Sequence, residues 1–191
     1  MIEVLSAFGL SAATGLNAYL PLLIVGLVAR FTDWIALKSP WNILENTWVL
    51  AVLAVLLLIE TIVDKIPAAD TVNDIIQTFI RPVAGAILFA AGANVISNVS
   101  PAAAMICGLV VAGGVHAAKA TTRPVITAST GGLGNPVIST VEDIVSGVST
   151  FFAIVLPVLA AVFIATLLGL FVWWRIRRRK RRAGGVQQLN Q

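Results

Sequence analysis

Three long stretches of this chain contain no Asp, Glu, Lys or Arg, and they constrain its fold more than any other feature. They run over Val4–Ala29, Pro82–Ala118 and Ile144–Trp174. A helix needs about 20 apolar residues to cross the hydrocarbon core of a bilayer, so each stretch can supply one or two spans. Only 12% of the 191 residues are charged, whereas charged residues make up about a quarter of a soluble domain. We therefore predict an all-α, polytopic helical membrane bundle.

We predict about five membrane spans, some of them broken or re-entrant. In order, they occupy Val4–Ala29, Trp48–Ile66, two spans within Pro82–Ala118, and Thr150–Trp174. Gly15 and Asn17 favour a break in the first span, and a kinked helix is the alternative. The polar stretch Lys119–Gly147 either forms a loop or re-enters the membrane.

A short amphipathic helix is predicted over Asp70–Ile80, between the second and third spans. Val72, Ile75 and Phe79 recur at helical spacing, whereas Asp74 falls on the other face. Asp70 is a suitable N-cap for this helix. We expect the apolar face to contact lipid or the bundle, and Asp74 to point toward a polar centre.

Basic residues are concentrated near the C-terminal end. Seven of the 13 Lys and Arg residues fall within 175–182, directly after Trp173 and Trp174. Such a run is retained on the cytoplasmic side, where it attracts anionic headgroups of membrane lipids. We therefore expect residues 1–174 to form a transmembrane domain and residues 175–191 a cytoplasmic tail that is disordered toward its end. Five spans then place the N-terminus outside. No soluble domain accompanies the basic run, so nucleic acid is not an expected partner.

Charged residues near the ends of the second and fourth spans form the candidate site. Glu60 and Asp64 share one helical face, and His116, Lys119 and Arg123 share another if the fourth span continues that far. Charges that face lipid cost several kcal/mol. We therefore expect these groups to point inward, with at least one acid–base contact between the two spans. The candidate binding residues are Glu60, Asp64, Lys65, Asp70, Asp74, Arg81, His116, Lys119, Arg123, Asn135, Glu142 and Asp143.

Other chemical signals are weaker. The pairs Asp70/Asp74 and Glu142/Asp143 suit a hard cation, but their spacing matches no closed metal loop, so a metal is left open and no cofactor is expected. The sequence contains no HExxH, GxSxG or P-loop motif.

A weak internal repeat is also present. Residues 11–17 resemble residues 127–135, and Arg81-Pro82-Val83 recurs as Arg123-Pro124-Val125. Paired interruptions of this kind indicate a transporter's midplane site. Chance similarity among small residues is the alternative.

Three motifs together resemble a known family. They are Thr-Gly-Leu-Asn-Ala-Tyr-Leu-Pro over residues 14–21, the charged pattern of Glu60–Arg81, and His-x2-Lys-x3-Arg with later Gly-Asn-Pro and Glu-Asp over His116–Asp143. They resemble an uncharacterised family of small bacterial membrane proteins, known only as a domain of unknown function, number 4126 in its series. The resemblance covers nearly the whole chain except the basic tail. It implies an integral protein of the bacterial inner membrane and no established activity.

Three functions are compatible with these features. In the first, the protein is a transporter or carrier, the charged residues bind a small solute or an anionic lipid head group, and Glu60 carries a proton or ion. The basic residues His116, Lys119 and Arg123 favour an anionic ligand. In the second, it is a membrane-embedded, lipid-modifying enzyme with His116 and an Asp as an acid–base pair. In the third, it is a scaffold whose charges only hold helices together. The substrate, the coupling ion and the oligomeric state are left open.

Overall fold

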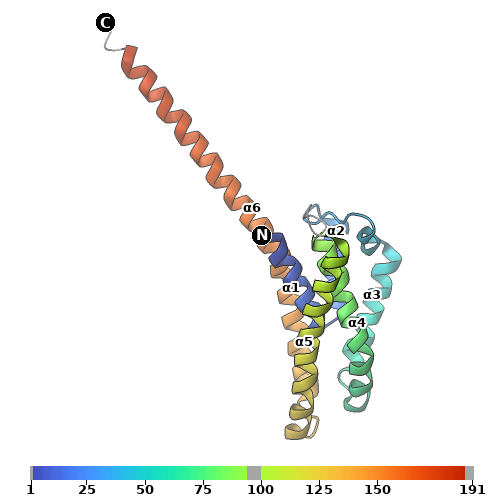
Figure 1. The fold of residues 1–191 in the computed structure, drawn as a ribbon. Coiled ribbons are helices and arrows are strands. Elements are labelled where there is room, and N and C mark those ends of the chain that lie inside the picture. Colours follow the sequence, from blue (N-terminus) through green and yellow to red (C-terminus); the bar gives the residue numbers. More distant parts are fainter. Residues whose placement is uncertain (1, 94–99, 188–191) are drawn as a thin grey trace. The chain divides into compact units, whose positions relative to one another are not determined.

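The computed structural model describes residues 2–93 and 100–187, and within them it is all-helical, as predicted (Figure 1). The elements are α1 (Ile2–Leu16), α2 (Tyr19–Phe31), the 3-10 helix η1 (Trp41–Glu45), α3 (Thr47–Val63), α4 (Pro67–Ala93), α5 (Pro101–Thr130) and α6 (Asn135–Gln187). The chain divides into two compact units, residues 1–154 and 155–191. All packing discussed below lies within the first unit.

Three helical segments are long and apolar enough to cross a membrane. They are Val72–Ala93 of α4, Pro101–Thr130 (α5) and Asn135–Pro157 of α6, and α1, α2 and α3 are shorter apolar helices. At 1.5 Å per residue α4 and α5 are about 40 and 45 Å long, more than the roughly 30 Å of a hydrocarbon core. Large apolar side chains on the outside, such as Ile75 (62% exposed) and Phe79 (73%), are typical of a lipid-facing surface. The chain is a helical membrane protein.

The first apolar stretch is not one span but two half-helices that fold back on each other. Ser146 of α6 donates a hydrogen bond to the carbonyl of Ala13 in α1 (2.9 Å). The next residue of α6, Gly147, lies beside Leu20 of α2. Ala13 and Leu20 are therefore at the same level of the bundle, and the chain reverses between them at Asn17. The break predicted near Gly15–Asn17 is confirmed, and we call this reversal the α1–α2 tip.

Small residues allow α1 to lie close to α4 and α5. Ser11 of α1 donates a hydrogen bond to the carbonyl of Gly108 in α5 (2.8 Å). A Cβ added at Gly85 of α4 would clash with the Ala112 side chain, and one at Gly15 would lie 2.6 Å from the Ala112 carbonyl. Such close backbone contact is how helices associate in lipid, where no hydrophobic force draws them together. The packing fixes the depth of the α1–α2 tip.

Helix α4 differs from the prediction because it continues through Pro82 to Ala93. The amphipathic stretch Asp70–Ile80 is thus the first half of a long helix and not a separate one. Neighbouring helices satisfy the backbone groups that an internal proline frees, so proline is tolerated in membrane helices. Because α4 begins at Pro67, Asp70 lies within its first turn and is not an N-cap. The side chain of Asp70 lies outside the described residues.

The polar stretch Lys119–Gly147 is neither a loop nor a separate re-entrant segment. Helix α5 passes through Pro124 to Thr130, and α6 begins at Asn135, so the stretch forms a helical hairpin. Gly131 (φ 61°) and Gly132 (φ 87°) make its turn in the left-handed conformation that favours glycine. Helix α6 continues to Gln187, so the domain boundary predicted at residue 175 falls within a helix. Disorder was predicted for residues 183–191, but residues 183–187 are helical and belong to α6. Residues 188–191 lie outside the described residues.

Candidate functional site

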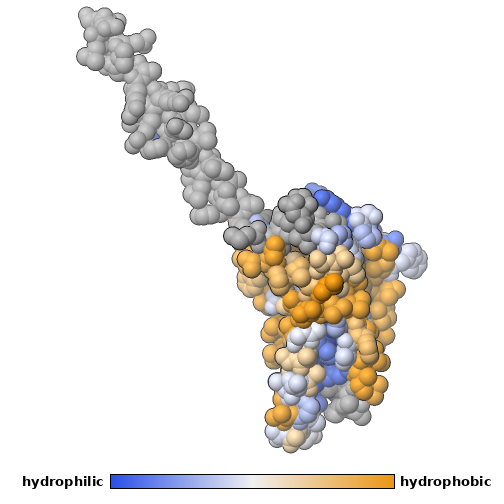
Figure 2. All heavy atoms as spheres, viewed as in Figure 1, coloured by the Kyte–Doolittle hydropathy of each residue, from blue (hydrophilic) through white to orange (hydrophobic). Residues whose placement is uncertain are grey.

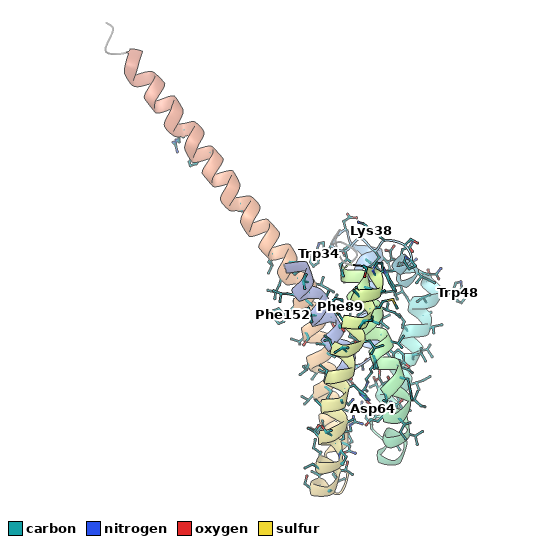
Figure 3. The ribbon with its side chains drawn as sticks, viewed as in Figure 1. Trp34, Lys38, Trp48, Asp64, Phe89 and Phe152 are labelled. Carbon is teal, nitrogen blue, oxygen red and sulfur yellow. The ribbon has the colours of Figure 1, made fainter. Side chains whose placement is uncertain are left out.

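Buried charged side chains from four helices meet in one cluster inside the first unit. We call it the charged cluster, and its members are Glu60, Asp64, Asp74, Arg81, His116, Lys119, Arg123 and Glu142. Arg81 and His116 lie near the middle of α4 and α5. Asp64 lies at the opposite end of the unit from Trp34, Lys38 and Trp48, which mark the α2–α3 connection (Figure 3). The cluster therefore occupies the other half of the bundle from that aromatic connection.

Arg81 is the most deeply buried member, with 0% of its surface exposed. Its Nη2 donates to Oε1 of Glu60 (3.0 Å), and its Nη1 lies 3.1 Å from Nδ1 of His116. A guanidinium can only donate, so Nδ1 of His116 accepts and the imidazole carries its proton on Nε2. That Nε2–H faces Oγ1 of Thr78 (3.0 Å), whose own hydroxyl donates to the Asp74 carbonyl (2.8 Å). His116 is therefore neutral here, with both ring nitrogens in hydrogen bonds.

Arg123 connects three carboxylates from three parts of the chain. Its Nη1 donates to Oδ2 of Asp74 in α4 (3.1 Å), and its Nη2 donates to Oε2 of Glu142 in α6 (3.3 Å). The same Nη2 lies 3.8 Å from Oδ2 of Asp64. Lys119 pairs with Oε2 of Glu142 at 2.8 Å. Glu60, Asp64, Lys119 and Arg123 are each at most 6% exposed. The predicted inward orientation and the acid–base contact between the second and fourth apolar segments are confirmed.

The α1–α2 tip reaches this cluster. The Nζ of Lys119 donates to the carbonyl of Leu16, the last residue of α1 (3.3 Å). The side-chain oxygen of Asn17 accepts from the backbone amides of Tyr19 (3.1 Å) and Leu20 (2.9 Å). The amide group of Asn17 donates to Asp143 of α6 (2.8 Å). A carbonyl end and an amide end of two half-helices, which carry opposite partial charges, thus lie beside the buried charges.

Several polar residues that complete the site were not predicted. Asp64 accepts hydrogen bonds from Asn73 (2.7 Å) and Ser139 (3.2 Å), in addition to its contact with Arg123. Thr78 contacts His116, and Asn17 bonds to Asp143. The helical spacing could have indicated Asn73 and Thr78, because both are neighbours of Asp74 on the polar face of α4. No pattern in the sequence marks Ser139 as a partner of Asp64.

Three predicted site residues lie outside the charged cluster. Lys65 is exposed on the α3–α4 connection, outside the buried cluster. Asn135 is buried at the start of α6, where it accepts from Thr127 (3.0 Å) beside the α5–α6 turn. Asp143 contacts the α1–α2 tip. The side chain of Asp70, as noted above, is not described.

The cluster is buried, but two of its described members are partly exposed. The side chains of Asp74 and Glu142 are 18% and 12% exposed. Thr78 of α4 and Thr122 of α5 are exposed. Figure 2 shows hydrophilic atoms in a narrow band between the lower halves of α4 and α5, flanked by hydrophobic surface. Water or a polar ligand therefore has a route to the cluster between these two helices.

The ion pairs of the cluster limit which kinds of ligand it can bind. Among the described residues, no group of three or more His, Cys, Asp or Glu side chains is arranged to hold a metal ion. Arg81, Lys119 and Arg123 each already face a carboxylate. An anionic ligand would therefore have to replace a carboxylate at one of these groups.

Comparison with known proteins agrees with the resemblance. The chain belongs to the family described as domain of unknown function (DUF4126), whose model matches residues 4–177. Neither the curated proteins nor the solved structures include a match to it.

Proposed function

We propose that this member of the family is a carrier in a cell membrane, and that the charged cluster together with the α1–α2 tip binds a small solute or an anionic lipid head group. The reversal of the chain at Asn17, inside the bundle, supports this most. Broken helices whose ends face charged side chains near the midplane form the substrate and ion sites of many secondary transporters. An unbroken helix satisfies its own backbone groups, so a purely structural bundle needs no such break.

Lipid phosphate and free phosphate offer the same chemistry to the cluster. Arg123 can hold a phosphate oxygen pair as it now holds Asp74 and Glu142. The polar band between α4 and α5 in Figure 2 would admit a head group from the side, with the acyl chains remaining in lipid. A free anion would enter by the same route from the aqueous side.

The membrane orientation is also a proposal. The α1–α2 reversal removes one crossing from the predicted five. The bias of Lys and Arg toward the cytoplasm assigns Arg30, at the end of α2, and Lys38, in the α2–α3 connection, to the cytoplasmic side. The same bias, taken from the sequence alone, assigns basic residues 175–182 to the cytoplasmic side. Lys119 and Arg123 do not count toward this bias, because both are held in ion pairs inside the bundle. We assign the protein to the bacterial inner membrane, multi-pass, with the basic tail against anionic lipid.

Transport in vesicles tests the proposal. The full chain is reconstituted in proteoliposomes, with head-labelled phosphatidylglycerol in one arm and labelled inorganic phosphate in the other. We expect flipping or uptake above protein-free vesicles in one arm, and we expect Arg123→Ala and Asp64→Asn to abolish it. Lys65→Ala, an exposed charge on the neighbouring connection, is the matched control and should transport normally. No transport in either arm, or normal transport by Arg123→Ala and Asp64→Asn, contradicts the proposal.

A second pair of changes separates a carrier from a scaffold. Replacing both partners of a buried ion pair by apolar residues is often neutral for stability. The double variant Lys119→Met with Glu142→Met should therefore keep the fold, since Arg123 retains Asp74 and Asp64. A carrier loses transport in this variant, measured in the vesicles above. Normal transport with a normal fold would show that the Lys119–Glu142 pair only holds the helices together and is not part of the binding site.

A further inference from the structure

Three side-chain oxygens in the described part of the first unit are buried without a hydrogen-bond donor: Oε2 of Glu60, Oε1 of Gln77 and Oδ1 of Asp74. Oε1 of Glu60 accepts from Arg81, but Oε2 has no partner. Oε1 of Gln77, one helical turn before Arg81 on α4, also has none. Glu60 and Gln77 are each 1% exposed. An unsatisfied buried acceptor costs about 1–3 kcal/mol, so each of these oxygens is more stable with a hydrogen-bond donor.

The charges of the cluster do not balance. Four carboxylates (Glu60, Asp64, Asp74 and Glu142) face three cations (Arg81, Lys119 and Arg123). His116 adds no positive charge, because its Nδ1 accepts from Arg81. Among the described members of the charged cluster, one negative charge is therefore not matched by a cation, and charges in the membrane interior cost several kcal/mol. A single bound proton removes it.

Glu60 is the carboxylate best placed to hold that proton. Both oxygens of Asp64 accept hydrogen bonds, from Asn73 and from Ser139. Asp74 and Glu142 are partly exposed and each receives Arg123. Glu60 is almost fully buried, has one donor only, and keeps Oε2 free.

We propose that Glu60 carries an exchangeable proton on Oε2, and that a proton is the coupling ion of the carrier. The inference rests on the proposed function for its transport role alone. The groups that face Glu60 are Arg81 from α4, Lys119 from α5, Asp64 at the end of α3 and Tyr19 from α2.

Arg81 can change its carboxylate partner when Glu60 gains or loses its proton. Its Nη1 lies 3.9 Å from Oδ1 of Asp74, and that oxygen has no hydrogen-bond partner. When Glu60 is neutral, Arg81 can shift its charge to Asp74, and when Glu60 loses its proton, Arg81 returns to it. The proton leaves to water along the polar band, and no other bond changes. The position of the Arg81 guanidinium thus depends on the proton: it lies toward Asp74 when Glu60 is protonated and toward Glu60 when the proton has left.

Infrared difference spectroscopy tests the site on the full chain in lipid nanodiscs. We expect a carboxylic-acid C=O band at neutral pH that shifts in heavy water, disappears at alkaline pH and is absent from Glu60→Gln. Asp143→Asn is the control, because Asp143 is also buried in part but bonds to Asn17, and it should keep the band. A band that survives Glu60→Gln, or that is lost in Asp143→Asn instead, overturns the assignment.

A sodium ion is the competing occupant. Unfolding temperatures are compared in sodium chloride and choline chloride, and we expect no difference between the two salts for the wild-type chain. Stabilisation by sodium that is lost in Glu60→Gln would replace the proton by a metal cation and overturn the proposal. Neither measurement requires transport, so failure here leaves the carrier proposal standing. Absence of transport with the band present would refute only the carrier.

Discussion

Removing Arg81 should destabilise the protein much more than removing the charge of its partner Glu60. Arg81 faces three groups: Oε1 of Glu60 at 3.0 Å, Nδ1 of His116 at 3.1 Å, and Oδ1 of Asp74 at 3.9 Å. Arg81→Met leaves Glu60, fully buried, and Asp74 without this cation. Breaking a buried pair from one side costs about 3–5 kcal/mol. We expect a loss of this size.

Glu60→Gln should cost about 1 kcal/mol or less, because the amide oxygen of Gln can accept the hydrogen bond that Arg81 donates to Glu60. Gln also reproduces the protonated form of Glu60, and Arg81 keeps His116 and can approach Asp74. The assay is unfolding of the full chain in mixed micelles by increasing denaturing detergent, followed by circular dichroism. Equal losses in Glu60→Gln and Arg81→Met, or a loss below about 1 kcal/mol in Arg81→Met, would refute this reasoning.

Three further predictions concern the bundle and its surface. Gly85→Ala should lower the unfolding free energy by about 1–3 kcal/mol through overpacking, because its Cβ clashes with α5, whereas Gly114→Ala, with no atom within 4 Å, should not. Asn17→Ala should cost about 1–2 kcal/mol in the same assay, because it removes the cap of α2. Ile75→Lys should reduce membrane insertion by about 2–3 kcal/mol, and Leu133→Lys at the exposed α5–α6 turn should not.

The helical faces of the site were predictable because they depend on spacing alone. Glu60 and Asp64 four residues apart, and His116, Lys119 and Arg123 at three and four, must share faces wherever their helices run. The cost of charge in lipid then requires those faces to point inward. The break at Asn17 was predictable for a similar reason, since Gly15 and Asn17 interrupt an otherwise continuous apolar run.

The choice of partners and the helix ends were not predictable in the same way. Pro82 and Pro124 predict helix ends in a soluble protein, yet α4 and α5 continue through both because neighbouring helices compensate. That Arg81 selects Glu60 depends on how α3 and α4 pack, which no local pattern reports. The sequence alone gave no reason to separate Lys65 from Arg81, because both are basic residues beside apolar segments. It lies one residue beyond the Asp64 cap of α3, where the chain turns outward.

The two repeated sequence motifs occupy similar places in the fold. Residues 11–17 end at the α1–α2 tip, and residues 127–135 span the α5–α6 turn. Each motif therefore lies where the chain reverses between two helices. Each also ends with an Asn at the start of the second helix: Asn17 bonds to the first turn of α2, and Asn135 is the first residue of α6. Arg81 and Arg123, each followed by Pro, both point into the charged cluster. The motifs occur in opposite order in the two halves of the chain. Duplication of one unit in tandem therefore does not account for them.

Accessibility of the charged cluster to water within the membrane tests the carrier proposal most directly. Thr78, which contacts His116, and Phe79, which is 73% exposed, are adjacent on α4 but face the polar band and the lipid respectively. Each is replaced by Cys in a chain with Cys107→Ser, and a charged, membrane-impermeant thiol reagent is applied to the protein in nanodiscs. We expect Thr78→Cys to react and Phe79→Cys to remain unmodified. Equal reaction at both positions, or none at Thr78→Cys, would contradict a water-accessible charged site embedded in the membrane.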